Sequence, residues 1–310
     1  LTYIRSEAER KQVRQAFGFY ISPDFMKELT RDPDKLRLGG ETRELSVMFT
    51  DIRGFTGISE SMSPEALIQL MNDFLTPMSD LVMHNRGTID KYMGDAMMAF
   101  WNAPLDDPDH ARHACLSALK MNEALAPINE ALRVRAEAER RPPLSLNAGI
   151  GINTGPASVG NMGSKQRFAY SALGDTVNLA SRLEGQTKTY GVNILIGPQT
   201  RRQVPDFATL ELDLLRVKGK KEPVHVYTLL GDEAFAASPS FTAWQQTHET
   251  MITQYRARDL NGAEKMIEKC MELSGGTLAA FYNLYRERIA ELRRSPPAAG
   301  WDGVFTATGK

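Results

Sequence analysis

A hairpin signal at residues 87–101, GTIDKYMGDAMMAFW, narrows the choice of folds more than any other feature of the sequence. Gly94 and Asp95 lie between two strand-like runs, which is typical of a two-residue turn that joins antiparallel strands. An apolar run at 44–50 predicts an earlier strand, and apolar positions recur at helical spacing over 64–85. The chain therefore begins its core with a strand, a helix and a hairpin.

The same alternation continues toward the C-terminus. A helix expected over 108–132 precedes strands at 144–152, 156–162 and 168–172, and a helix is expected over 175–189. A further strand and a closing hairpin follow, before residue 232. Helices that separate the strands of one sheet predict an α+β fold, a ferredoxin-like βαββαβ sheet covered by helices.

Composition excludes several classes of protein. The chain has 310 residues and a formal net charge of -1, so no basic excess indicates nucleic-acid binding. It contains no apolar run of 18 residues, and we expect no membrane span within it. Cys115 and Cys270 are far apart and lack metal-ligand spacing, which favours a reducing compartment. Because the chain begins with Leu1, we expect a segment upstream of it in the full protein.

Two acidic residues stand at the ends of predicted strands. Asp51 follows the apolar run VMFT, and Asp95 lies in the hairpin turn. Each alone is typical of a turn former. In a ferredoxin-like sheet the two strands are neighbours, so the pair predicts a site for hard divalent cations, Mg²⁺ or Mn²⁺, shared with substrate phosphates. The loop RGFT, with Phe55 and Thr56, is expected to offer backbone N–H groups to phosphate after Gly54. Spacing alone leaves polymerase-palm, nucleotide cyclase and phosphohydrolase functions open.

The sequence contains four motifs in this order: FTDIRGFT, DKYMGDAMMAFW, GIGINTG and YSALGDTVNLASRLE. Together they resemble the class III nucleotidyl cyclase catalytic domain. The resemblance covers residues 44–230. It looks most like bacterial adenylate cyclases in which this domain follows a sensor and membrane segment. The resemblance implies conversion of ATP to 3′,5′-cyclic AMP and pyrophosphate. There are two alternatives: the chain is a guanylate cyclase, or it is a catalytically weak homologue that binds nucleotide for regulation.

The resemblance also assigns the metal and base-reading positions. It implies that Asp51 and Asp95, together with the backbone carbonyl of Ile52, bind two metal ions per site. It makes Lys91 a donor to the adenine N1 atom, where guanylyl cyclases carry an acid. Ser171 departs from the usual aspartate of animal adenylyl cyclases and from the usual cysteine of guanylyl cyclases, but its hydroxyl can accept from the adenine amino group.

The remaining roles fall on a helix and on a basic turn. By resemblance, Asn178 binds the ribose and Arg182 stabilises the transition state, whose charge suits a planar guanidinium. The two are four residues apart and share a helix face. A helix-surface ion pair of Arg182 with Glu184 or with a neighbouring residue is the alternative to this role. Lys218 matches the lysine that binds the triphosphate, and Lys220 or Lys221 is the alternative for this role.

Three segments are expected along the chain. Residues 1–40 are predicted to form an N-terminal signalling helix and linker, 41–232 the catalytic domain, and 233–310 a C-terminal helical extension, TPR-like in pattern, with an irregular tail. The resemblance implies a homodimer with ATP as substrate, a site shared between subunits, and a cytoplasmic location in a membrane-anchored protein.

Overall fold

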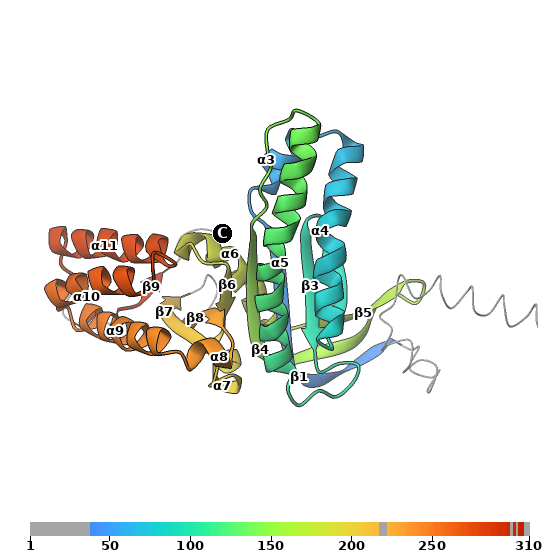
Figure 1. The fold of residues 1–310 in the computed structure, drawn as a ribbon. Coiled ribbons are helices and arrows are strands. Elements are labelled where there is room, and N and C mark those ends of the chain that lie inside the picture. The colour runs from blue at the N-terminus through green and yellow to red at the C-terminus, as the bar shows by residue number, and fades with distance from the viewer. Residues whose placement is uncertain (1–37, 217–221, 298–299, 302, 307–310) are drawn as a thin grey trace, which may run out of the picture.

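The described part of the chain forms one mixed sheet with helices packed on it (Figure 1). The computed structural model describes residues 38–216, 222–297, 300–301 and 303–306, and the helix predicted at the N-terminus lies outside them. The strands are β1 (Gly39–Ile52), β2 (Thr88–Met93), β3 (Ala96–Trp101), β4 (Ala148–Gly163), β5 (Phe168–Leu173), β6 (Ile194–Ile196), β7 (Ala208–Arg216), β8 (Val224–Gly231) and β9 (Phe305–Thr306). The helices are α3 (Phe55–Glu60), α4 (Pro64–His84), α5 (His110–Ala138), α6 (Asp175–Tyr190), α7 (Pro198–Gln203), α8 (Glu233–Ala236), α9 (Pro239–Arg256), α10 (Leu260–Leu273) and α11 (Ala279–Arg294).

The predicted hairpin is present and sets the sheet order. β2 and β3 pair antiparallel around Gly94, whose φ of 67° is the left-handed conformation that glycine adopts without strain. β3 then pairs with β1, and β1 with β4, both antiparallel. The order β2-β3-β1-β4, built from a β-α-β-β-α-β chain, is the ferredoxin-like arrangement, so the predicted fold class is confirmed.

Both faces of the sheet are buried, which explains the nearly continuous apolar strands. Successive residues of a strand point to opposite faces. Met48 packs with α4 and α5, which run side by side over one face (Figure 1), whereas Val47 packs with residues of α6 on the other. α4 starts where Ser63 accepts a hydrogen bond from the Ala66 amide and a proline occupies the first turn.

Three predicted details are wrong. The strands expected at 144–152 and 156–162 are one strand, β4, because β1 pairs with it continuously from Ala148 to Asn161 and holds it extended through Pro156. The loop expected at Phe55 and Thr56 is instead the start of the short helix α3, which begins directly after Gly54. The tail is not wholly irregular, because β9 pairs parallel with β7 and Phe305 lies 4.0 Å under the Arg288 guanidinium.

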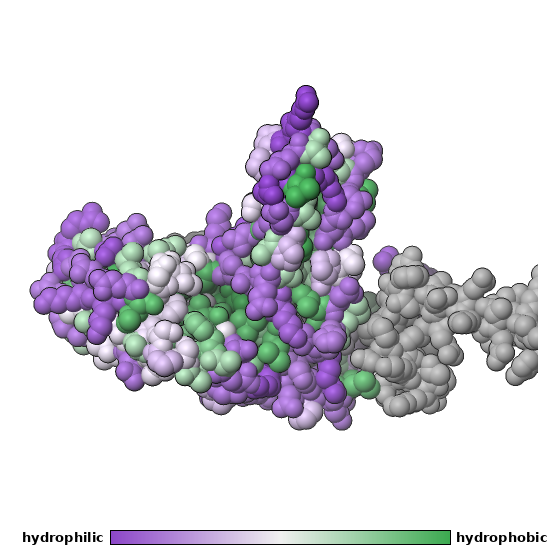
Figure 2. All heavy atoms as spheres, in the orientation of Figure 1, coloured by the Kyte–Doolittle hydropathy of each residue, from purple (hydrophilic) through white to green (hydrophobic). Residues whose placement is uncertain are grey.

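The C-terminal helices pack against the sheet through a shared apolar core. Residues of α9, α10 and α11 join those of β7, β8 and α6 in one cluster. Asp213 of β7 accepts hydrogen bonds from Tyr190, at 2.9 Å, and from Arg288 of α11, at 2.7 Å, so that a buried charge is paired across three elements. On the face drawn in Figure 2, the outer end of these helices is hydrophilic and apolar side chains gather toward the middle of the molecule. Within the described residues, no helix is both long enough and apolar enough to span a bilayer.

His248 gives this junction a testable pH dependence. Its Nε2 atom donates to the Glu211 carbonyl at 2.6 Å, and its Nδ1 atom accepts from the Tyr282 hydroxyl at 2.9 Å, so the buried imidazole is neutral. Burial lowers its pKa from 6.5 to about 4. A lowered histidine pKa stabilises the fold above 6.5 and loses that effect as the pH falls toward 4. We therefore expect this group alone to lower the free energy of unfolding by about 2 kcal/mol between pH 7.5 and 5.

Urea unfolding of wild type and His248→Gln at the two pH values measures this contribution. The variant should be less stable at pH 7.5 and lose less stability than wild type on acidification. An identical loss in both proteins would contradict the assignment.

Candidate active site

Two carboxyl groups meet at one end of the sheet, as the sequence predicted. Asp51 is the penultimate residue of β1, and Asp95 lies in the turn that leads into the neighbouring β3. The pKa of Asp51 is raised to about 7, first by burial and then by the side-chain hydrogen bond and negative charge of Asp95. The negative charges of two half-buried acids repel each other, and a cation bound between them would reduce that repulsion.

The donor set fits a hard divalent cation. The Oδ1 atom of Asp51 is buried without a hydrogen-bond partner among the described residues, so an acceptor is available for a metal. The described chain holds no group of three or more acidic, histidine or cysteine side chains placed for a metal. Ile52, the predicted backbone ligand, is 3% exposed and pairs with Ala148 in the β1–β4 ladder.

Glu184 is a third acid at this end of the sheet that sequence reasoning did not assign to the site. Burial raises its pKa to about 7, the positive charge of Arg53 opposes that shift, and Asp95 adds to it. Glu184 comes this close because β4 carries glycine under α6. A Cβ atom at Gly151 would lie 2.2 Å from the Glu184 amide nitrogen, and one at Gly149 would lie 2.8 Å from Oε1 of Glu184. The alternating glycines of GIGI were the available signal.

The segment after Asp51 turns away from the strand at once. Gly54 has a φ of 69° and precedes α3, the six-residue helix that starts with Phe55 and Thr56. Phe55 packs against the core formed with α4 and α5, and Thr56 is exposed. The core contact fixes this turn beside Asp51, where its role in binding substrate phosphate stays a prediction.

The two predicted base-reading residues lie together, although 80 positions separate them in sequence. The Lys91 Nζ atom of β2 donates to the Ser171 hydroxyl of β5 at 3.3 Å. Ser171 is 5% exposed, while the Lys91 side chain is 46% exposed. A partly exposed cation donor and a buried hydroxyl acceptor therefore lie side by side.

The helix residues form a third group. Asn178 is exposed and Arg182 half-buried on α6, which packs against β4. No ion pair of Arg182 is found in the part of the chain that the structure describes, so the alternative pairing with Glu184 is not observed. Lys218 lies outside the described residues.

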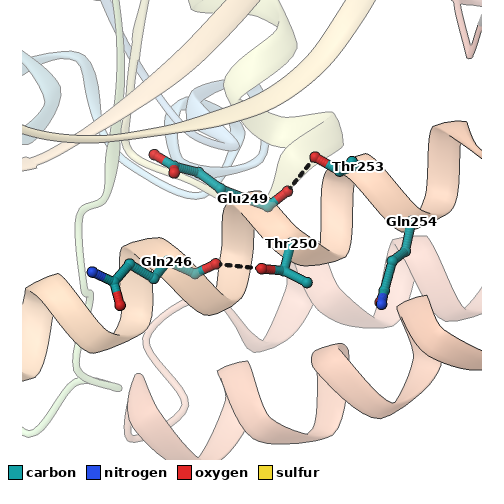
Figure 3. Close-up of a pocket in the computed structure, with 5 residues that line it drawn as sticks. All are labelled: Gln246, Glu249, Thr250, Thr253 and Gln254. Carbon is teal, nitrogen blue, oxygen red and sulfur yellow. Dashed lines mark hydrogen bonds between the residues drawn. The ribbon is translucent and has the colours of Figure 1, made fainter.

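No hydrogen bond or ion pair between described residues joins the acid pair, the base-reading pair and the α6 pair to one another. A hollow along α9 includes no residue of these three groups. As Figure 3 shows, it is lined by side chains of that helix alone, and the Thr250 and Thr253 hydroxyls donate to the carbonyls of Gln246 and Glu249. Those hydroxyls are committed to the helix backbone, which makes the hollow a surface feature.

Comparison with known proteins agrees with this geometry. Residues 40–231 match the family described as adenylate and guanylate cyclase catalytic domain. Over 69% of its length the chain is 40% identical to adenylate cyclase 1 of Rhizobium meliloti (strain 1021), of which it covers 32%. The chain spans less than half the length of the curated relatives that it matches.

Solved structures give the same result. A crystal structure of an adenylyl cyclase from P. aeruginosa is 33% identical, with a TM-score of 0.56, and the match covers 63% of this chain and 97% of that one. A crystal structure of a guanylyl cyclase is 32% identical, with a TM-score of 0.55, covering 63% and 95%. The chain therefore belongs to the adenylate and guanylate cyclase catalytic domain family.

Proposed function

We propose that the chain is an adenylate cyclase that converts ATP to 3′,5′-cyclic AMP and pyrophosphate. The observation that carries this choice is the contact between Lys91 and Ser171. An ammonium group can only donate, which suits the adenine N1 acceptor and opposes the N1–H of guanine. Similarity to a guanylyl cyclase structure keeps guanylate cyclase as the second candidate. The complete set of acids, base-reading residues and helix residues argues against a merely regulatory homologue.

The acids would hold two Mg²⁺ or Mn²⁺ ions, through Asp51, Asp95 and the Ile52 carbonyl. When bound, these ions would lower the pKa of the ribose 3′-hydroxyl and neutralise triphosphate charge. In the reaction the ribose 3′-hydroxyl gives its proton to water and its oxygen bonds to the α-phosphorus. The bond from that phosphorus to the oxygen that bridges to the β-phosphate breaks, and pyrophosphate leaves.

The other residues bind and orient the substrate. In this proposal Lys91 and Ser171 bind the base, Asn178 holds the ribose, and Arg182 faces the charge that develops at the α-phosphate. Lys218 contacts the triphosphate, and the turn with Phe55 and Thr56 faces the phosphates. Arg182 suits this role because its guanidinium has no ion pair among the described residues.

We further propose that the working unit is a homodimer with sites shared between two copies. Exposed apolar side chains flank the base-reading pair: Tyr92 and Met93 of β2 are 49% and 43% exposed, and Leu173 of β5 is 58% exposed. A second copy would cover them and bring its acids to the base-reading pair. An upstream sensor or membrane segment, and a cytoplasmic location, remain predictions from the resemblance.

Base selection tests the proposed substrate. We expect wild type to form cyclic AMP from ATP in preference to cyclic GMP from GTP, with Mg²⁺ or Mn²⁺ present. Lys91→Glu should lower kcat/KM for ATP at least about tenfold more than for GTP, because an acceptor then opposes the adenine N1 acceptor.

Lys269→Glu, the same charge reversal on α10, is the matched control and should leave both values near wild type. An unchanged ratio of ATP to GTP in Lys91→Glu would show that Lys91 does not read the base. A wild-type preference for GTP would replace the first candidate with the second.

A further inference from the structure

Asp90 contacts both base-reading residues, Lys91 and Ser171, through its buried carboxylate. Its side chain is fully buried, and its Oδ2 atom accepts from the Ser171 hydroxyl at 2.6 Å and from the Ala172 amide at 3.3 Å. Its Oδ1 atom pairs with the Lys91 ammonium at 3.2 Å. One buried carboxylate thus contacts both side chains that face the base, as well as the backbone of β5.

A local irregularity of the strand makes this contact possible. Neighbouring residues of a regular strand point to opposite faces of the sheet. The register of β2 with β3 shifts between Ile89 and Lys91, which places Asp90 at a bulge. A bulge re-aims side chains, and here Asp90 and Lys91 both reach Ser171.

The carboxylate decides which way the serine hydroxyl points. A hydroxyl has one proton and two lone pairs, whereas an ionised carboxylate can only accept. The Ser171 proton is therefore committed to Asp90, and its oxygen is left as an acceptor. The Lys91 ammonium, paired with the same carboxylate, remains a donor.

We propose that Asp90 is a positioning residue for base selection, which fixes the Ser171 hydroxyl as an acceptor beside the Lys91 ammonium. This inference rests on the proposed function, because it concerns the site that reads the base. The fixed pattern matches adenine, which presents the N1 acceptor and the 6-amino donor. Guanine presents N1–H and O6, so it would set donor against donor and acceptor against acceptor. Without Asp90, the serine hydroxyl could turn and donate to O6.

Asp90→Asn is the decisive variant. Its amide oxygen would turn to the Lys91 ammonium and its NH₂ group to Ser171, which frees the serine proton to point at the base. We expect the ratio of kcat/KM for ATP to that for GTP to fall at least about tenfold. Competition of ATP and GTP against a fluorescent N-methylanthraniloyl ATP should show the same change in binding.

Two further variants separate positioning from simple support of the strand. In a Ser171→Ala background, Asp90→Asn should change the ratio less than about twofold, because its route to the base is gone. Combining Asp90→Asn with Ser171→Asp should restore the preference for ATP, because the carboxylate then accepts from the 6-amino group directly. If Asp90 only supported the strand, Ser171→Asp would not restore the preference for ATP in the Asp90→Asn variant.

The outcomes that overturn the inference are distinct. Equal loss for ATP and GTP in Asp90→Asn, or the same loss of ratio in the Ser171→Ala background, would remove it. If Asp90→Asn does not fold, the wild-type protein provides the test with purine riboside triphosphate, which lacks the 6-amino group. We expect kcat/KM for ATP to exceed that for this analogue at least about tenfold. Equal values for the two substrates would overturn the inference.

Binding separates this failure from failure of the proposed function. A wild type that forms no cyclic nucleotide but binds ATP more tightly than GTP would end the cyclase proposal. The binding ratios of the variants would then still decide the role of Asp90. A wild type that binds neither nucleotide would overturn both.

Discussion

Asp51→Asn and Asp95→Asn should each lose cyclase turnover by at least about a hundredfold at saturating Mn²⁺. The change keeps the size of each side chain and removes the negative charge that would hold a cation. Asp51 has a buried Oδ1 atom without a described partner, so the loss falls on an acceptor that no other described residue uses. Steady-state cyclic AMP formation measures the effect.

The folded state should survive Asp51→Asn, which separates loss of the site from loss of structure. An acid whose pKa is raised to about 7 from 3.8 favours the folded state when protonated, and it opposes folding as the pH rises through 7. Asparagine carries no charge, so without metal at pH 8 the variant should be at least as stable as wild type. Added Mn²⁺ should raise the melting temperature of wild type but not of Asp51→Asn.

Glu268→Gln, an acid-to-amide change at an exposed position of α10, is the matched control and should keep wild-type turnover. Only a few-fold loss in either aspartate variant at saturating metal would contradict the assignment of the acid pair.

Mixing two inactive variants should restore activity. Asp51→Asn alone and Arg182→Ala alone should both be inactive, because each damages every site of its own dimer. A mixed dimer would contain one site with both defects and one site with none. With random re-pairing about half of the dimers are mixed, so recovery should approach roughly a quarter of the wild-type rate.

The exposed apolar side chains beside the base-reading pair support this expectation. Within one chain the acid pair and the α6 pair share no hydrogen bond or ion pair among described residues, and apolar side chains beside the base-reading pair are exposed. Mixing Asp51→Asn with Asp95→Asn is the matched control, because both defects fall on the same half-site and no intact site can form. Persistent inactivity of the first mixture, despite demonstrated subunit exchange, would show that the site lies within one chain.

Much of the fold follows from local patterns in the sequence. Gly94 and Asp95 predicted the hairpin, and apolar runs together with helical spacing predicted the order of the elements. The continuity of β4 could not be predicted, because Pro156 is a local signal against a strand. Pairing with β1, a long-range effect, overrides it.

The sequence pointed to candidate residues whose types alone indicate a chemistry, and their roles stay predictions. Asp51 meets Asp95, as the pairing of β1 with β3 requires. Lys91 meets Ser171 although their strands, β2 and β5, are not neighbours in the sheet order. Asp90 and Glu184 were missed because their importance depends on packing. A bulge turns Asp90 toward Ser171, and glycines of β4 let α6 bring Glu184 close to the acid pair. Such close approaches between distant segments are not visible in local spacing.

One measurement tests the central claim most directly: the products that the purified wild-type chain forms from ATP labelled at the α-phosphate, with Mn²⁺ present. We predict labelled 3′,5′-cyclic AMP and pyrophosphate in equal amounts, and neither product from the Asp95→Asn variant. Formation of ADP or AMP in place of cyclic AMP, or no product from a folded chain that binds ATP, would contradict the claim that this site is an adenylate cyclase.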